Sequence, residues 1–170
     1  MKRTAMAVLL ATLSHGVLAE DKLCLTTKYD AYIDASLQWY QDLTDLTTQQ
    51  YPQLAEVSEW FLTGRQHHFE FSRQALRYYL DNEPDKVATQ RSVEEWLSLE
   101  QLDIKHLAER DDKLGQLANI TYRDRQSAPH DDNYILRSAL ADILSQPALI
   151  GNALHTYHQS ISQLEQRDCQ

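Results

Sequence analysis

Four long segments of the chain place apolar residues three or four positions apart, at residues 25–50, 53–81, 86–121 and 132–168. This spacing puts the apolar side chains on one face of an α-helix. No segment alternates apolar and polar residues between hairpin turns, the pattern that is typical of half-buried strands. The sequence therefore predicts an all-α protein with one domain, residues 20–170.

Prolines and polar turns divide these segments. Pro52 suits the first turn of the second helix, and the Asn82-Glu83-Pro84-Asp85 stretch ends it. Residues 122–131 are predicted to form the one longer loop, and Pro147 is predicted to kink or restart the last helix. Four helices joined mostly by short loops favour an antiparallel up-down-up-down four-helix bundle.

The N-terminus has the pattern of a secretory signal peptide, residues 1–19. Lys2 and Arg3 precede an apolar stretch at residues 5–13, and small residues before Ala19 indicate cleavage between Ala19 and Glu20. The apolar stretch is about half the ~20 residues that span a bilayer, and no later segment is longer, so we expect no membrane span in the mature chain. We therefore expect export to the bacterial periplasm or secretion; the alternative is an N-terminal core helix.

The two cysteines, Cys24 and Cys169, lie near opposite ends of the predicted mature chain. Export would bring both thiols into an oxidising compartment, where disulfides form. With an even number of antiparallel helices, the start of the first and the end of the last lie at the same end of a bundle, so a Cys24–Cys169 disulfide is predicted. Two free thiols, or a bridge between molecules, are the alternatives.

The composition is acidic, with 25 Asp and Glu against 16 Lys and Arg and a formal charge of −9. Removal of residues 1–19 takes away two basic residues and no acidic one, so the charge becomes −11. Such a charge argues against binding to nucleic acid, whose phosphates require a basic surface, and against anionic membranes. It permits a basic protein partner.

Known motifs of enzymes and cofactor-binding bundles are missing from the sequence. There is no Cys-x-x-Cys-His, no paired Glu-x-x-His, no glycine-rich phosphate loop, and no nucleophile or zinc-protease motif. Both methionines lie in the predicted signal peptide, so methionine ligation of haem is excluded. The sequence predicts neither an enzyme nor a cofactor.

One group of polar and aromatic residues is predicted to lie in a layer halfway along the bundle. Residue counts from the helix ends, at about 1.5 Å per residue, bring His68 and Glu100 to the same level as Tyr157. The candidate ligands for zinc or copper are His68, Glu100, His155 and His158. The candidate lining of a small-ligand pocket is His68, Glu100, Tyr157, His158, Tyr32 and Trp39. In the simpler interpretation, His68 and Glu100 only bond to each other in the core.

These features favour an exported protein-binding module, for example an inhibitor or immunity-type protein that neutralises a basic toxin or hydrolase. A small-ligand or metal-binding bundle is the alternative function. A second apolar stripe on the second helix could exceed the needs of the core and mediate oligomer formation. Its residues are Leu62, Phe69, Leu76 and Leu80.

Overall fold

The computed structural model describes residues 14–169, and their side chains from Asp21 onward. Within this range the chain forms six α-helices and no strand, so the all-α prediction is confirmed. Residues 14–19 of the predicted signal peptide lie in the first helix, and residues 1–13 lie outside the described range. The helices are α1 (Ser14–Gln50), α2 (Ala55–Asn82), α3 (Gln101–Leu107), α4 (Lys113–Gln126), α5 (Asn133–Leu144) and α6 (Pro147–Glu165).

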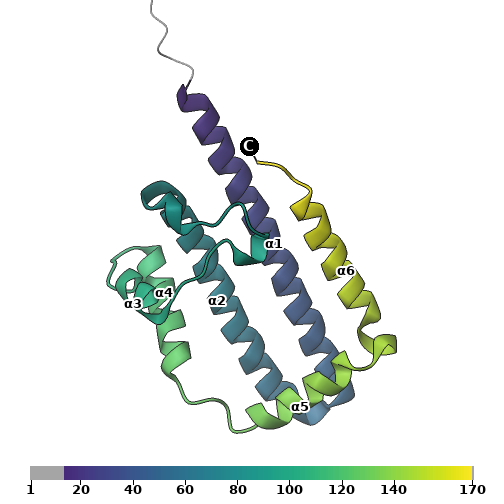
Figure 1. Ribbon diagram of the computed structural model, residues 1–170. Helices are drawn as coiled ribbons and strands as arrows, with labels where there is room; N and C mark the ends of the chain where they lie inside the picture. The colour runs from purple at the N-terminus through teal and green to yellow at the C-terminus, as the bar shows by residue number, and fades with distance from the viewer. Residues whose placement is uncertain (1–13, 170) are drawn as a thin grey trace, which may run out of the picture.

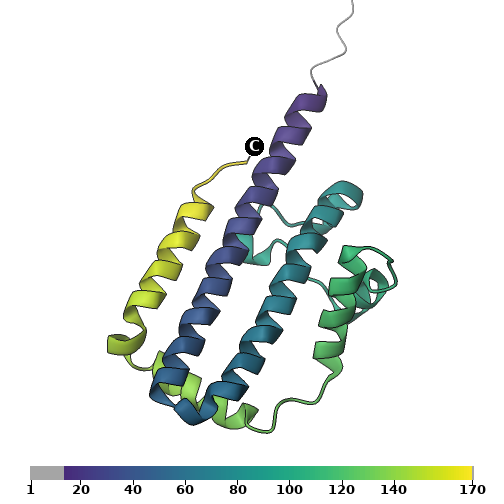
Figure 2. The same ribbon diagram turned by 180° about the vertical axis from the view of Figure 1, so that it is seen from behind.

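Helices α1 and α2 form an antiparallel pair at the centre of the molecule (Figures 1 and 2). Helix α6 lies on the outer side of α1, and α4 lies on the outer side of α2. These four helices alternate in direction, as the sequence predicts. However, α4 and α6 are separated by the central pair, so the helices lie in the order α4, α2, α1, α6 and do not close into the compact four-helix arrangement that we expected.

The prediction of one continuous helix over residues 86–121 is wrong. Residues 83–100, which we call the crossing segment, contain only single 3-10 turns at Pro84–Lys86 and Val93–Glu95 and pass over α1 (Figure 1). Val93 and Trp96 are fully buried from this irregular backbone, and the Trp96 ring stacks on Tyr29 of α1 at 6.1 Å between centroids. The segment thus covers part of the core that a third long helix would have covered.

Helices α3 and α4 form a tight hairpin, and a side-chain cap marks the start of each helix. Glu100 begins α3 in a capping box with Asp103, and the Asp112 carboxylate accepts the Gly115 N–H at 3.0 Å to cap α4. A Cβ atom at Gly115 would collide with the carbonyl oxygen of Arg110. Glycine at this position therefore allows the chain to turn closely from α3 into α4.

Pro147 restarts the last helix, as predicted. Helix α5 ends at Leu144, and α6 begins at Pro147, whose missing N–H is tolerated in the first turn. Helix α5 lies across the end of the molecule where α1 turns into α2 (Figure 1). Its residues Leu136 and Ile143 are fully buried there, and Asp142 accepts a 2.5 Å hydrogen bond from the Tyr51 hydroxyl.

The predicted disulfide is confirmed: Cys24 and Cys169 are bonded, with 5.5 Å between their Cα atoms. Lys28, one turn further along α1, is buried next to it. Its ammonium group donates a 3.0 Å hydrogen bond to the carbonyl of Arg167 and lies 3.9 Å from the Glu165 carboxylate. The C-terminal residues are therefore held against α1 by both covalent and polar contacts.

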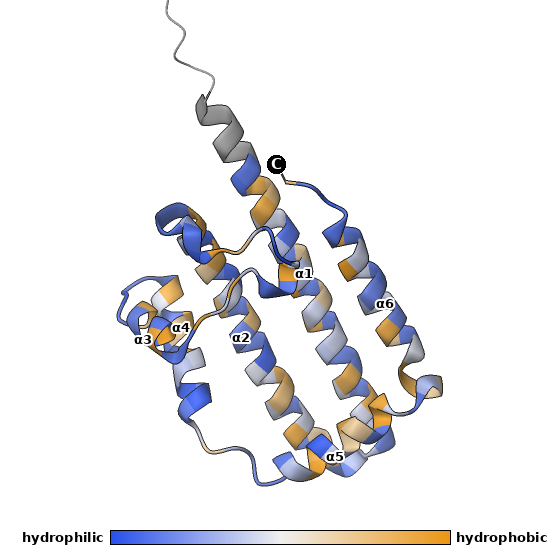
Figure 3. Ribbon diagram, in the orientation of Figure 1, coloured by the Kyte–Doolittle hydropathy of each residue, from blue (hydrophilic) through white to orange (hydrophobic). Residues whose placement is uncertain are grey.

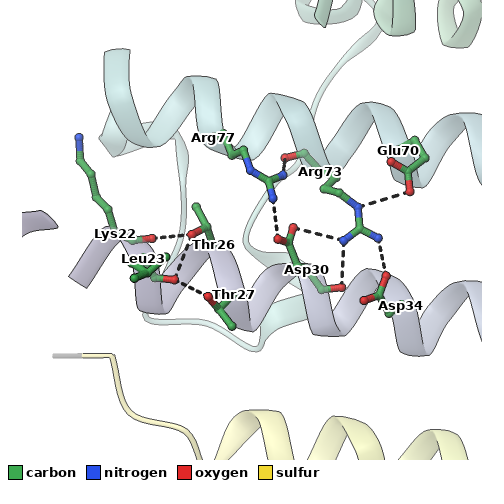
Figure 4. Close-up of polar contacts among 9 residues, drawn as sticks. All are labelled: Lys22, Leu23, Thr26, Thr27, Asp30, Asp34, Glu70, Arg73 and Arg77. Carbon is green, nitrogen blue, oxygen red and sulfur yellow. Dashed lines mark hydrogen bonds and ion pairs between the residues drawn. The ribbon is translucent and has the colours of Figure 1, made fainter. Parts of the chain in front are cut away.

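Charged side chains link α1 and α2 along one face of the pair (Figure 4). Arg73 of α2 contacts Asp34 at 2.6 Å and Asp30 at 3.3 Å, and Arg77 contacts Asp30 at 2.5 Å. Isolated surface ion pairs contribute little to stability, but a shared network in which Arg73 is mostly buried contributes more.

The second apolar stripe of α2 belongs to the core of this chain. Apolar positions recur along both central helices (Figure 3). Each of the four residues that we considered for oligomer formation is buried within the chain, so they offer no spare apolar surface: Leu62, Phe69, Leu76 and Leu80.

Candidate functional site

The predicted mid-bundle layer is split between two sides of the central helix pair. Trp39 of α1 faces α6, where the Trp39 and Tyr157 rings lie 5.7 Å apart, whereas the Tyr32 ring packs on Phe69 of α2 at 6.2 Å. The Tyr157 hydroxyl donates a 2.9 Å hydrogen bond to Glu94 of the crossing segment. Burial, and then this carboxylate, raise the pKa of Tyr157. Trp39 and Tyr157 thus pack α6 against α1 and the crossing segment.

The four candidate metal ligands are not brought together. Glu100 caps α3 and is exposed, His155 and His158 are exposed on α6, and His68 of α2 faces α4. Within residues 21–169, no group of three or more His, Cys, Asp or Glu side chains is arranged to hold a metal ion. Glu100 is misplaced in the prediction because residue counts along 86–121 assumed a continuous helix, and His68 does not bond to it.

His68 instead lines a pocket between α2 and α4, which we call the α2–α4 pocket. Its cavity has a volume of about 370 Å³. The residues that matter most for its chemistry are Trp60, Gly64, Arg65 and His68 of α2 and Asp124 and Arg125 of α4.

The electrostatics of the α2–α4 pocket are basic, in contrast to the whole protein. Burial, and then the guanidinium groups of Arg125 and Arg65, lower the pKa of His68 to about 4. The Arg65 guanidinium lies 4.9 Å from the Phe61 ring centre. His67 and Asp124 pair with each other at 2.7 Å. At pH 7 His68 is therefore neutral, between two positive charges.

Arg125 has no anionic partner among the described residues. Its side chain forms no hydrogen bond or ion pair there, and partial burial lowers its pKa. A guanidinium that is partly desolvated without compensation is costly, so an anion that reached Arg125 would be stabilised.

Acidic residues are concentrated at the end of the molecule that is formed by the α1–α2 turn and α5 (Figure 1). We call residues 41–63 and 127–146 the acidic end. Residues 41–63 and 127–146 contain seven acidic residues and only one Lys or Arg, Arg137. None of the seven forms an ion pair with Lys or Arg, whereas such pairs are frequent elsewhere in the described chain. The seven are Asp42, Asp45, Glu56, Glu59, Asp131, Asp132 and Asp142.

Large apolar side chains are exposed at the same end. Tyr134 of α5 is 81% exposed and its neighbour Ile135 is 53% exposed, and Trp60 and Leu144 are also exposed. Elsewhere in the described chain only Leu23 and Leu102 are large, apolar and exposed. The acidic end therefore combines carboxylates that have no Lys or Arg partner with exposed apolar surface.

Sequence reasoning found His68 but missed its neighbours. The signal for the pocket was Gly64, a glycine inside a long helical pattern, and the signal for the acidic end was the absence of Lys and Arg from residues 41–63. Neither signal involves a known motif.

No protein family, curated protein or solved structure is significantly similar to this chain. Among the described residues, no helix has the length and apolar character needed to cross a bilayer.

Proposed function

We propose that this protein is an exported protein-binding module that docks a basic partner protein through its acidic end. The observation that carries the proposal is the set of seven carboxylates at this end, none of which is paired with Lys or Arg. Like charges at this density repel one another, and a basic surface would relieve this repulsion. The exposed Tyr134 and Ile135 would then supply apolar contact area.

Complementary charge chiefly accelerates encounter and selects the partner, whereas buried aromatic and aliphatic residues hold the complex. The acidic end offers both kinds of residue. This combination suits an inhibitor or an immunity-type protein that covers the basic surface of a toxin or hydrolase.

Export is the second part of the proposal. The pattern of residues 1–19 supports a signal peptide cleaved between Ala19 and Glu20, leading to the periplasm or to secretion. The Cys24–Cys169 disulfide is consistent with an oxidising compartment. Mass spectrometry of the protein from the exported fraction tests this part, because it should find Glu20 as the first residue.

Two charge-reversal variants test the docking surface. The first is Glu56→Lys/Glu59→Lys/Asp132→Lys at the acidic end. The control is Asp85→Lys/Glu109→Lys/Asp111→Lys, which makes the same change of net charge at exposed positions outside the acidic end. Each protein is immobilised and used to capture proteins from the exported fraction of the producing organism.

We expect the unmodified protein and the control to retain the same basic protein, which is released at high salt because exposed charges are screened. The acidic-end variant should lose it. Equal capture by both variants, or a partner insensitive to salt, would contradict the proposal.

A further inference from the structure

The α2–α4 pocket is open directly above a glycine in the middle of α2. A glycine inside a helix costs about 1 kcal/mol relative to alanine. A Cβ atom at Gly64 would meet no other atom within 4 Å, so close packing does not require glycine here. A larger side chain at this position would occupy the cavity. The glycine keeps space free that the fold itself does not fill.

The charged side chains that line the pocket favour an anionic ligand. Arg65 and Arg125 are positive, Asp124 is negative and paired with His67, and His68 is neutral at pH 7. The two guanidinium groups and the Asp124 carboxylate together carry one net positive charge. One anionic charge, as on a carboxylate, would balance it, whereas a phosphate dianion would exceed it.

The aromatic lining of the pocket favours a ligand whose anionic group is attached to a flat apolar part. Trp60 and Phe61 contribute aromatic surface to the lining, and Arg65 is held beside the Phe61 and Tyr40 rings at 4.9 and 5.1 Å. Pockets for small molecules are mostly apolar, with a few polar groups that fix orientation. Arg125 is available as such a group because it has no partner of its own among the described residues.

We propose that the α2–α4 pocket binds a small organic monocarboxylate with a flat apolar body. The carboxylate pairs with the guanidinium of Arg125, and the body lies against Trp60 over Gly64. This binding site shares Trp60, Phe61, Thr63 and Ser127 with the acidic end but none of its seven carboxylates, so each proposal can fail without the other.

Binding should change the protonation of His68. The charged groups that face this ring are Arg65 on its own helix and Arg125 on α4, beside the His67–Asp124 pair. A bound carboxylate would offset the positive charges of Arg65 and Arg125. The pKa of His68 should therefore rise from about 4 when the ligand binds, which a ligand bound elsewhere would not cause.

The experiment uses benzoate and naphthoate as probes, with benzamide and naphthamide as neutral counterparts and inorganic phosphate as the competing anion. Binding to the mature protein is measured by calorimetry, and the His68 ring is followed by NMR titration. Arg125→Gln removes the charge, and Gly64→Leu fills the cavity. Gly151→Leu is the matched control, because Gly151 of α6 also has no atom within 4 Å of an added Cβ.

We expect at least one carboxylate to bind saturably and to raise the pKa of His68. Binding should weaken by about tenfold or more in Arg125→Gln, since hydrogen bonds to charged groups contribute this much. Gly64→Leu should abolish it, and Gly151→Leu should leave it unchanged. If the helix content shows that Gly64→Leu does not fold, the proposal is tested by the binding of the carboxylates to Arg125→Gln and by the binding of the neutral amides to the unmodified protein. Absence of saturable binding, equal affinity for the amides, tighter binding of phosphate, or an unchanged His68 pKa would overturn the proposal.

Discussion

The hydroxyl of Tyr157 in α6 donates a 2.9 Å hydrogen bond to the carboxylate of Glu94 in the crossing segment. A second contact repeats this link, because Glu165 of α6 accepts a 2.7 Å hydrogen bond from the backbone N–H of Val93. Together they tie α6 to a segment without regular secondary structure. Side chains of α6 thus help to hold the crossing segment over the core.

Removing the Tyr157 hydroxyl should therefore destabilise the protein. Tyr157→Phe should lower the free energy of unfolding by about 1 kcal/mol, the usual net contribution of one hydrogen bond. Urea denaturation checks this value. Tyr134→Phe is the control and should have no effect, because Tyr134 is 81% exposed. Equal effects of the two substitutions would show that the Glu94 contact contributes nothing.

Removing the disulfide should lower stability much more. The bond joins residues 145 positions apart, and the chain-entropy model gives roughly 5 kcal/mol as an upper bound for so long a loop. Cys24→Ser should lower the urea midpoint strongly while helix content at low temperature is retained. Reduction of the unmodified protein should give the same midpoint as Cys24→Ser. An unchanged midpoint in either case would contradict a structural role for the bond.

Two glycine-to-alanine substitutions should have effects of opposite sign. Gly64→Ala should raise the free energy of unfolding by about 0.5–1 kcal/mol, because alanine favours the helix and its Cβ has space. Gly115→Ala should lower it by about 1–3 kcal/mol, because its Cβ would collide with the Arg110 carbonyl oxygen. Thermal and urea denaturation of both variants check the signs. Stabilisation by Gly115→Ala would mean that the α3–α4 turn is less tight than described.

Stability should fall on acidification through the titration of His68. Its pKa is about 4 in the folded protein against an ordinary value of 6.5, so between these values the unfolded chain binds a proton that the folded chain does not. The free energy of unfolding should therefore fall as the pH drops from about 6.5 to 4, by at most about 3 kcal/mol, and this contribution should level off below pH 4.

The variant His68→Gln should remove this part of the pH dependence, measured as urea midpoints across the range. His155→Gln, a change at an exposed histidine of α6, should retain it. Asp112 acts in a separate range, because its pKa is lowered to about 2 by Arg110 and the Gly115 N–H, so its stabilising effect is lost only below about pH 4. Identical pH profiles for the two histidine variants would rule out His68 as the source.

The sequence predicts the helices best where local chemistry determines their ends. Pro52 and Pro147 mark helix starts because their fixed φ and missing N–H suit a first turn. The crossing segment was misread because Val93 and Trp96 are three residues apart, which matches a helix. Burial of these two side chains does not require a helix. The irregular backbone of the crossing segment, bonded to Glu165 and packed on α1, also directs them into the core.

The candidate site was harder to predict, for a related reason. Arg65 and Arg125 are sixty residues apart and meet at one pocket only because α4 packs on α2. Their spacing along the chain carries no information about this. Glu100 and His68 were paired by counting residues along a helix that is interrupted. His68 lies on a continuous helix, α2, but it faces α4 and not the predicted partner Glu100.

The bond between Cys24 and Cys169 makes residues 24–169 a closed covalent ring. A protease that cuts the exposed backbone between α4 and α5 would open this ring without releasing a fragment. Such a nicked molecule would migrate as a single species under denaturing conditions and separate into two pieces only after reduction. Where proteases are abundant and reductants scarce, one cut would therefore leave every helix of the ring attached to the rest.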